Sequence, residues 1–214
     1  MKKFIKILNL NICIEVMVIE KYIAWFSDLD KDSLPLAGGK GNNLGIMYNL
    51  GLPVPGGFVV TTYAFKYFIH VTGIDTKIFS ILSELDVEDN DKLQAAEKEI
   101  QGLVLSTPMP LQIRQAILEA YEHMNVDPAI RGSGVEALIL PGRDAANVAV
   151  RSSATAEDLP DASFAGEMAT YLNIKGSKNL LAATLACWAS LYTARAMYYR
   201  VKNHFPHDKV FIAV

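Results

Sequence analysis

A lysine among glycines near the start of the chain could hold an anion. The run 37–44 reads AGGKGNNL, with Lys40 at its centre. Glycines let backbone N–H groups approach a phosphate, a helix that starts after them adds partial positive charge, and Lys40 adds a full charge. The run is not a Walker A loop, which requires Gly, four residues and then Gly-Lys-Ser/Thr. A glycine-rich helix start with a solvated lysine would give the same pattern, so both interpretations stay open.

Arg151 is the second candidate for phosphate binding. It follows the apolar strand pattern Val148-Ala149-Val150 and precedes small hydroxyl residues at 152–155. A guanidinium at a strand end can bind phosphate oxygens through two N–H groups, and Ser and Thr can add short-range donors. Surface pairing of Arg151 with Glu157 or Asp158 is the structural alternative. These two carboxylates alone underdetermine metal coordination, so they are more typical of a solvated turn than of a metal site.

Gly166 and Arg195 are two further candidates. Gly166 precedes a strand pattern in FAGEMATY at 164–171, which suggests close approach of a flat ligand or a phosphate, although a bulge or tight turn would also explain it. Arg195 falls at helical spacing with the apolar positions of the segment 177–202. A buried arginine requires an anionic partner. We therefore expect Arg195 to face the core and to meet a phosphate, with a hidden carboxylate or an extended, solvated side chain as alternatives.

The histidines and cysteines do not suggest a metal site or a nucleophile. The four histidines are His70, His123, His204 and His207. None has a second ligand at metal spacing or a Ser or Cys nucleophile in a recognisable setting. Cys13 and Cys187 lie far apart in sequence, which fits a reduced cytoplasmic protein better than a disulfide framework.

The composition is that of an ordinary soluble domain. The 214 residues are 51% hydrophobic and carry a net charge of −3. This mild acidity argues against a nucleic-acid surface, because no excess of Lys and Arg is available to neutralise phosphates. No stretch reaches the roughly 18 to 20 apolar residues of a membrane span. Residues 1–16 are interpreted as an extension, with an extra edge element as the alternative.

The elements that must position these residues mix helices and strands. Strands are expected at 58–60, 148–150, 169–174 and 209–214, with the second and third as neighbours in one sheet. Helices are expected after the glycine run to about residue 51, capped by Asn42 or Asn43; at 63–71, capped by Thr61 or Thr62; two or three times over 75–125; and at 177–202. We expect 125–147 to be irregular and 152–163 to be a polar loop. The apolar run 211–214 has no turn or polar tail after it, so that strand looks interrupted.

Five segments, in this order, resemble one protein family. They are AGGKGNNLG at 37–45, GLPVP at 51–55, FVVT at 58–61, the block 148–173, and CWASLYTARA at 187–196. They are similar to the N-terminal nucleotide-binding domain of the phosphoenolpyruvate synthase and pyruvate phosphate dikinase family, a domain that rifampicin phosphotransferases share. The resemblance covers about residues 17–214, and 148–173 is its most specific part.

The resemblance implies an ATP-grasp-like α/β (α+β) domain that is C-terminally incomplete, with a helical insertion at about 75–125. It implies ATP as ligand, with Lys40, Arg151 and Arg195 on the phosphates. It also implies a nucleotide cleft lined by Gly166, Glu167, Met168 and Thr170. Phosphoryl transfer depends mostly on positioning and charge neutralisation, for which such cations are suited. No catalytic residue and no metal ligand is expected among these positions.

The resemblance also implies a reaction that this sequence cannot complete alone. In the family, a phosphoryl group of ATP passes to a histidine on a swivelling domain and then to pyruvate on a TIM barrel. ATP, pyruvate and water become AMP, phosphoenolpyruvate and phosphate, with magnesium. The expected magnesium ligands, the histidine domain and the barrel are missing, so pyruvate would bind only through these missing domains. A companion chain that carries the rest of the enzyme is one way in which they could be supplied. Gly56 also stands where the family usually has a second proline. A rifampicin phosphotransferase fragment and a non-catalytic nucleotide-binding remnant are the alternatives.

Overall fold

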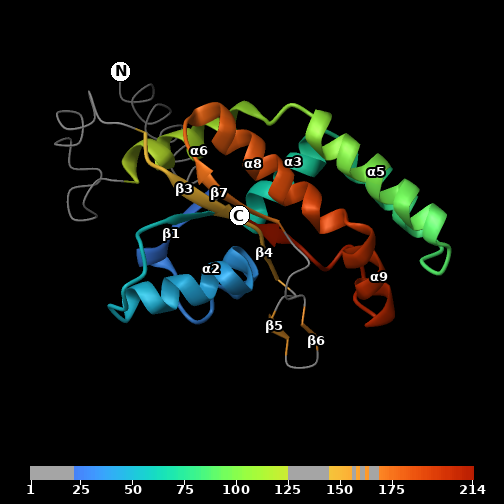
Figure 1. The fold of residues 1–214 in the computed structure, drawn as a ribbon, viewed down its shortest axis with the longest axis horizontal. Coiled ribbons are helices and arrows are strands. Elements are labelled where there is room, and N and C mark those ends of the chain that lie inside the picture. The colour runs from blue at the N-terminus through green and yellow to red at the C-terminus, as the bar shows by residue number, and fades with distance from the viewer. Residues whose placement is uncertain (1–21, 125–144, 156–157, 160–161, 164–168) are drawn as a thin grey trace, which may run out of the picture.

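The computed structural model describes residues 22–124, 145–155, 158–159, 162–163 and 169–214 (Figure 1). In chain order the elements are β1 (Ile23–Trp25), the 3₁₀ helix η1 (Phe26–Asp28), α2 (Leu34–Asn49), β2 (Phe58–Val60), α3 (Thr62–Val71), α4 (Ile74–Ser83), α5 (Asn90–Ser106), α6 (Leu111–His123), β3 (Val148–Arg151), β4 (Ser153–Ala154), β5 (Asp158–Leu159), β6 (Ala162–Ser163), β7 (Thr170–Ile174), α8 (Ser177–Ala189), the 3₁₀ helix η3 (Ser190–Tyr192), α9 (Ala194–Lys202) and β8 (Ile212–Ala213). The prediction of a mixed helix and strand fold is confirmed.

The strands form short antiparallel pairs, and backbone hydrogen bonds connect two of these pairs. β1 pairs with β2, and β4 pairs with β8 with Ser153 opposite Ala213. Val60 and Val214 exchange both backbone hydrogen bonds, at 2.7 and 2.9 Å. Val214, the residue after β8, therefore connects the β4–β8 pair to β2 of the β1–β2 pair. Two of these strands were predicted: β2 at 58–60 and β8 at 209–214. β8 is shorter than expected.

The β3–β7 pair extends this arrangement. β3 leads through Ser152 into β4 and pairs with β7, with Arg151 opposite Thr170. The Ser152 N–H donates to Ala169 O at 3.1 Å, so the contact continues past the end of β3. The predicted pairing of these two strands is confirmed. The segment predicted as a polar loop contains β4 and the β5–β6 pair. Most of the predicted irregular connection at 125–147, and the predicted extension at 1–16, lie outside the described residues.

The first helices begin and end where the sequence indicates. Thr61 caps α3, because its Oγ1 accepts a hydrogen bond from the Ala64 N–H at 3.3 Å. Gly73, with a φ of 72°, separates α3 from α4. Three helices, α4 to α6, occupy the region predicted to be helical. The carboxylate of Glu97 on α5 accepts a hydrogen bond from the Ala194 N–H at 3.0 Å, so α5 also caps the start of α9.

The segment 177–202 was predicted to form one long helix, but it forms two, α8 and α9. This changes the face on which the predicted site residue Arg195 lies. The 3₁₀ helix η3 follows α8, and Thr193 is extended, with φ −67° and ψ 149°. Thr193 Oγ1 then caps α9 by accepting from the Ala196 N–H at 3.1 Å. The break resets the helical phase, so Arg195 is exposed and Arg200 is buried with 1% of its surface accessible. The prediction that Arg195 faces the core was wrong.

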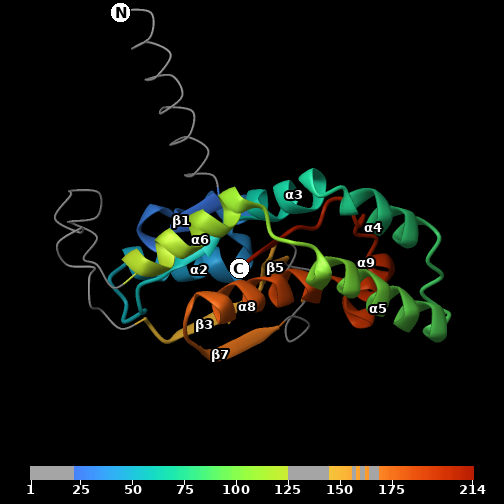
Figure 2. The same ribbon diagram turned by 90° about the horizontal axis from the view of Figure 1, so that it is seen from above.

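The main core lies around α8. Trp188 is fully buried, and its ring stacks on Phe68 with a centroid distance of 5.0 Å. Figure 2 shows the β3–β7 pair on one side of α8 and the layer of α3 and α6 on the other, and α8 contacts α5, α6, β3 and β7. In the described part of the chain, no helix combines the length and apolar character needed to cross a membrane.

Candidate functional site

Helix α2 passes through the glycine-rich run but is broken at Gly38. This residue has φ 68° and ψ 176°, so a new helical stretch begins at Gly39. The expected break after Ala37 is therefore present, although a helical turn precedes it. The expected cap is different. The Gly41 N–H, which occupies the third position of the new stretch, donates to Ser153 Oγ at 2.9 Å. Ser153 of β4 therefore caps this helical stretch, a role that was predicted for Asn42 or Asn43.

The glycines of α2 allow close packing against other segments. A Cβ on Gly38 would lie 2.2 Å from Ser153 O, and one on Gly45 would lie 2.5 Å from Leu29 Cβ. Ser153 Oγ also donates to Ala37 O at 2.8 Å, so the broken helix and β4 are joined on both sides of Gly38. The structural interpretation of these glycines is therefore supported, and they hold Lys40 at a fixed place next to β4.

Lys40 is half-buried rather than fully solvated, and its ammonium lies beside the residue that follows Arg151. Lys40 Nζ donates to Ser152 O at 3.3 Å. Burial raises the pKa of the Cys187 thiol to about 12, and the positive charge of Lys40 opposes this rise only in part. The buried Cys187 thiol is therefore protonated at neutral pH. The arrangement brings the positive charge of the glycine-rich run to the end of β3.

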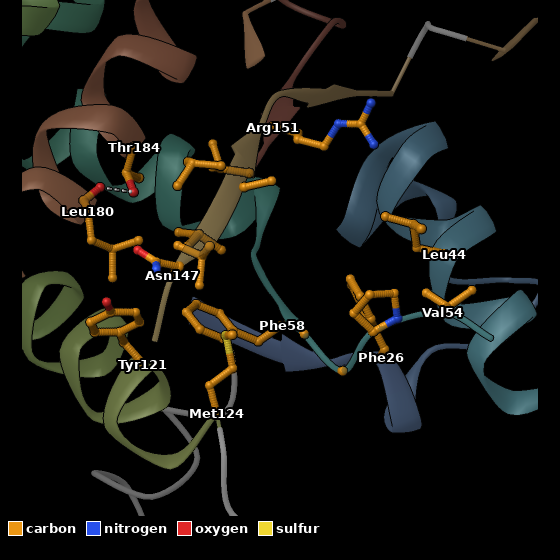
Figure 3. A pocket seen from close by; sticks show the side chains of 18 residues that line it. Phe26, Leu44, Val54, Phe58, Tyr121, Met124, Asn147, Arg151, Leu180 and Thr184 are labelled. Atoms are coloured by element: carbon orange, nitrogen blue, oxygen red, sulfur yellow. Dashed lines mark hydrogen bonds between the residues drawn. The ribbon is translucent and has the colours of Figure 1, made fainter. Parts of the chain in front are cut away.

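Arg151 is exposed at the end of β3, directly opposite Thr170 of β7, which is also exposed. Residues directly opposite in an antiparallel pair have side chains on the same face, so Arg151 and Thr170 present donors to one surface. Arg151 also lines a hollow of about 350 Å³ that neither Lys40 nor Arg195 lines. Figure 3 shows its guanidinium extending from β3 toward the helix that carries Leu44, at the border of this hollow.

The hydroxyl groups that follow Arg151 bind the backbone instead of projecting as free donors. Ser152 Oγ donates to Ala169 O at 3.0 Å, and Ser153 Oγ donates to Ala37 O. Thr155 Oγ1 donates to Phe211 O at 3.4 Å and accepts from the Phe211 N–H at 3.1 Å. The prediction that Ser and Thr here supply donors to a phosphate is thus wrong for this arrangement, because their protons are used to join strands.

The remaining predicted residues are placed only in part. Gly166, Glu167 and Met168 lie outside the described residues, as does Glu157. Arg195 is exposed in the first turn of α9. Two residues before it, Thr193 lines a hollow of about 410 Å³ together with Ala169 and Tyr171, but Arg195 does not line it. The structure therefore brings Lys40 to the residue that follows Arg151, and the phosphate roles of Lys40, Arg151, Thr170 and Arg195 stay predictions.

Two polar residues of this region, Ser153 and Asn42, are buried, which was not predicted from the sequence. Ser153 is buried and connects the broken helix to β4. Asn42 is 5% exposed, and its Oδ1 accepts no hydrogen bond within the described part of the chain. The serine pair directly after Arg151 was visible in the sequence. Its contact with Gly41 was not, because 112 residues separate them.

The described residues do not supply a metal site. None of their His, Cys, Asp and Glu side chains form a group of three or more that could hold a metal ion. The charged side chains near the end of β3 are instead an ammonium and a guanidinium, which suit an anion. A divalent cation does not fit them.

Comparison with known proteins identifies the family. The profile of the pyruvate phosphate dikinase AMP/ATP-binding domain matches residues 34–214. The chain belongs to this domain family. The predicted resemblance is confirmed, and Lys40, Arg151, Thr170 and Arg195 all lie within the matched part of the pyruvate phosphate dikinase domain.

Relatives with the same domain are much longer proteins. A probable phosphoenolpyruvate synthase of Methanocaldococcus jannaschii is 48% identical over 193 residues, which are 90% of this chain and 15% of that protein. A probable phosphoenolpyruvate synthase of Archaeoglobus fulgidus is 48% identical over 192 residues, or 90% of this chain and 24% of that protein. The phosphoenolpyruvate synthase of Pyrococcus furiosus is 39% identical over 225 residues, or 90% of this chain and 26% of that protein. The chain thus spans about a quarter or less of these relatives.

Proposed function

We propose that this chain is the ATP-binding part of a phosphotransferase of the phosphoenolpyruvate synthase type. The observation that carries the proposal is the hydrogen bond from Lys40 Nζ to Ser152 O at 3.3 Å. It brings a half-buried ammonium next to the strand end that carries Arg151. Membership of the AMP/ATP-binding domain family supports ATP as the anion that these charges bind.

The two cations have complementary roles in the proposal. Arg151 is exposed and can form two parallel N–H to oxygen bonds with one phosphate. Lys40 is a point charge held by the helical stretch that restarts at Gly39, whose N-terminal end adds partial positive charge. Thr170, on the same face as Arg151, would contact the nucleotide together with Gly166, Glu167 and Met168. Arg195 would contribute a third charge from the start of α9.

The proposal extends to the fold and the whole enzyme. We assign the chain to an ATP-grasp-like domain, with α4 to α6 as a helical insertion. The whole enzyme would convert ATP, pyruvate and water to AMP, phosphoenolpyruvate and phosphate through a phosphohistidine on another domain, in the cytoplasm. Magnesium would be held by residues outside those described, since these do not form a cluster of metal ligands. The relatives named as synthases favour this reaction over a rifampicin phosphotransferase.

Binding of ATP to the chain and to four single variants tests the proposal. We expect Arg151→Ala and Lys40→Ala each to weaken ATP binding about tenfold, since a hydrogen bond to a charged group contributes about 1.5–3 kcal/mol. Arg114→Ala on α6 and Lys98→Ala on α5 are the matched controls, because both side chains are exposed and neither lines the hollows near Arg151 and Ala169. An NMR titration is suitable because it also measures weak binding. If Arg151→Ala binds ATP as tightly as Arg114→Ala, the proposed phosphate role is wrong.

A further inference from the structure

The β3–β7 pair has an inner face that packs on α8. Val150 of β3 is 5% exposed, and Tyr171 of β7 lies directly opposite it. Tyr171 lines a hollow together with Ala186 and Ala189 of α8, so both strands point these side chains toward that helix. Figure 2 shows α8 on this side of the pair and no described helix on the other side. The pair therefore also has an outer face, which is turned away from α8.

The outer face carries four exposed residues. Successive side chains of a strand alternate between the two faces, so the neighbours of Val150 and Tyr171 in sequence point outward. These neighbours are Ala149, Arg151, Thr170 and Leu172, and all four are exposed. Arg151 is opposite Thr170, and Leu172 follows Thr170 on the same face about 7 Å further along β7. The outer face thus changes from cationic to hydroxyl-bearing to apolar along one line.

A bulge ends this face directly after Leu172. Asn173 has a φ of 55°, and the register of the pair shifts between Val148 and Val150. Leu172 and Asn173 therefore both lie opposite Ala149, which is the arrangement of a β-bulge, a feature common next to binding sites. The side chain of Ala149 is a single methyl group. One side of Leu172 is consequently left uncovered, and the leucine is 66% exposed.

We infer that Leu172, beside Ala149, is the contact surface for the purine ring of the nucleotide whose phosphates Arg151 binds. The inference rests on the proposed function for the role of Arg151 and for ATP as ligand. ATP has the same order of polarity as the outer face, with an anionic triphosphate, a ribose that carries hydroxyl groups, and a flat ring with apolar faces. Contact with that ring removes apolar surface of Leu172 from water, while Arg151 and Thr170 orient the polar part.

The first test compares two probes, ATP and tripolyphosphate, by methyl NMR of the whole chain. Tripolyphosphate carries the phosphates but has no ribose and no base. ATP should shift the methyl resonances of Leu172 upfield, because the face of an aromatic ring shields a nearby methyl group, and tripolyphosphate should not. The spectrum of Leu172→Ala assigns these resonances. If ATP leaves them unshifted, or if tripolyphosphate shifts them equally, the inference is wrong.

Binding of the same probes to variants provides the second test. Leu172→Ala should weaken ATP binding about fivefold, since part of the apolar contact is lost, and should leave tripolyphosphate binding unchanged. Leu111→Ala is the matched control, because this leucine of α6 is 53% exposed and does not line the hollow beside Arg151. Equal ATP binding by Leu172→Ala and Leu111→Ala overturns the inference, as does equal weakening of both probes by Leu172→Ala.

Arg151→Ala separates this inference from the proposed function. It should weaken both probes, because it removes a phosphate contact that they share. If Arg151→Ala weakens both probes and Leu172→Ala weakens neither, only the contact with the purine ring is refuted. If Arg151→Ala weakens neither probe, the proposed phosphate site fails as well. Light scattering of Leu172→Ala tests whether the outer face binds a second copy instead. Loss of an oligomer without loss of ATP affinity would overturn the inference.

Discussion

Ser153 Oγ accepts a hydrogen bond from the Gly41 N–H at 2.9 Å across 112 residues of sequence. The same oxygen donates to Ala37 O, on the other side of the break at Gly38. One hydroxyl thus fixes the start of a helical stretch against the strand that follows Arg151. Since Lys40 lies within that stretch, the contact also sets the position of the lysine relative to the arginine.

Replacement of Gly38 should be far more damaging than replacement of a glycine at an open site. Gly38 has φ +68° and ψ 176°, a region that is essentially restricted to glycine, and a Cβ there would lie 2.2 Å from Ser153 O. Gly38→Ala should lower the free energy of unfolding by about 3 kcal/mol or more, because strain and a backbone clash add together. Gly51→Ala is the control, since Gly51 has φ +72° but no atom within 4 Å of its added Cβ. Gly51→Ala should lower the free energy of unfolding by only about 1 kcal/mol. Urea unfolding measures the stability of both variants. An equal loss of stability in Gly38→Ala and Gly51→Ala would contradict the predicted backbone clash at Gly38.

The free energy of unfolding of two variants can test whether Arg200, and not Arg195, is the buried arginine of this segment. Arg200 is buried, and its Nη1 donates to Leu191 O at 2.6 Å while its Nε donates to His207 Nδ1 at 2.9 Å. Arg200→Ala should lower the free energy of unfolding by about 2–4 kcal/mol, because it removes these bonds and leaves a cavity. Arg195→Ala should change it by less than about 0.5 kcal/mol, as is usual at an exposed position. Chemical denaturation of both variants is the measurement. A larger loss for Arg195→Ala would restore the original prediction.

Stability should fall as the pH is lowered from about 6.5 toward 4. Burial, and secondarily the charge of Arg200, lowers the pKa of His207 from its usual value of about 6.5 to about 4. The unfolded chain therefore binds more protons than the folded chain in this window, so stability decreases with falling pH. His207→Gln keeps an acceptor for Arg200 without titrating, and it should flatten the pH dependence of urea unfolding between pH 6.5 and 4.5. The carboxyls of Asp30, Asp75 and Asp89, whose pKa values are lowered from 3.8, titrate below this window. An unchanged slope in His207→Gln would contradict the assignment.

Local sequence signals predicted the elements that depend on local interactions. The strand at 58–60, the Thr61 cap and the β3–β7 pair follow from residue pattern and capping chemistry, and all three are present. The helical spacing of apolar residues before Ser190 does not predict which face is buried after Tyr192. A 3₁₀ helix at Ser190–Tyr192 and an extended Thr193 interrupt the helix there. Arg195 was therefore assigned to the wrong face.

Long-range contacts were beyond the reach of sequence patterns. The glycine run suggested an anion site, but the partner that explains Gly38 is a backbone carbonyl of β4. In the same way, the serines after Arg151 suggested phosphate donors because their partners, Ala37 O and Ala169 O, come from remote segments. The phosphate roles of Lys40 and Arg151 stay predictions, and the contact of Lys40 with Ser152 O, across 112 residues, became visible only in three dimensions.

The carboxylate of Glu97 links a helix of the region predicted to be an insertion to the first turn of α9 through the Ala194 N–H. Gln101 Nε2 donates to the other oxygen of Glu97 at 3.2 Å and orients it. A shortened chain without α4 to α6 would therefore lose more than a peripheral module. It would expose the helix start that carries Arg195 and uncover the core around Trp188, so attempts at miniaturising this domain should begin from its other loops.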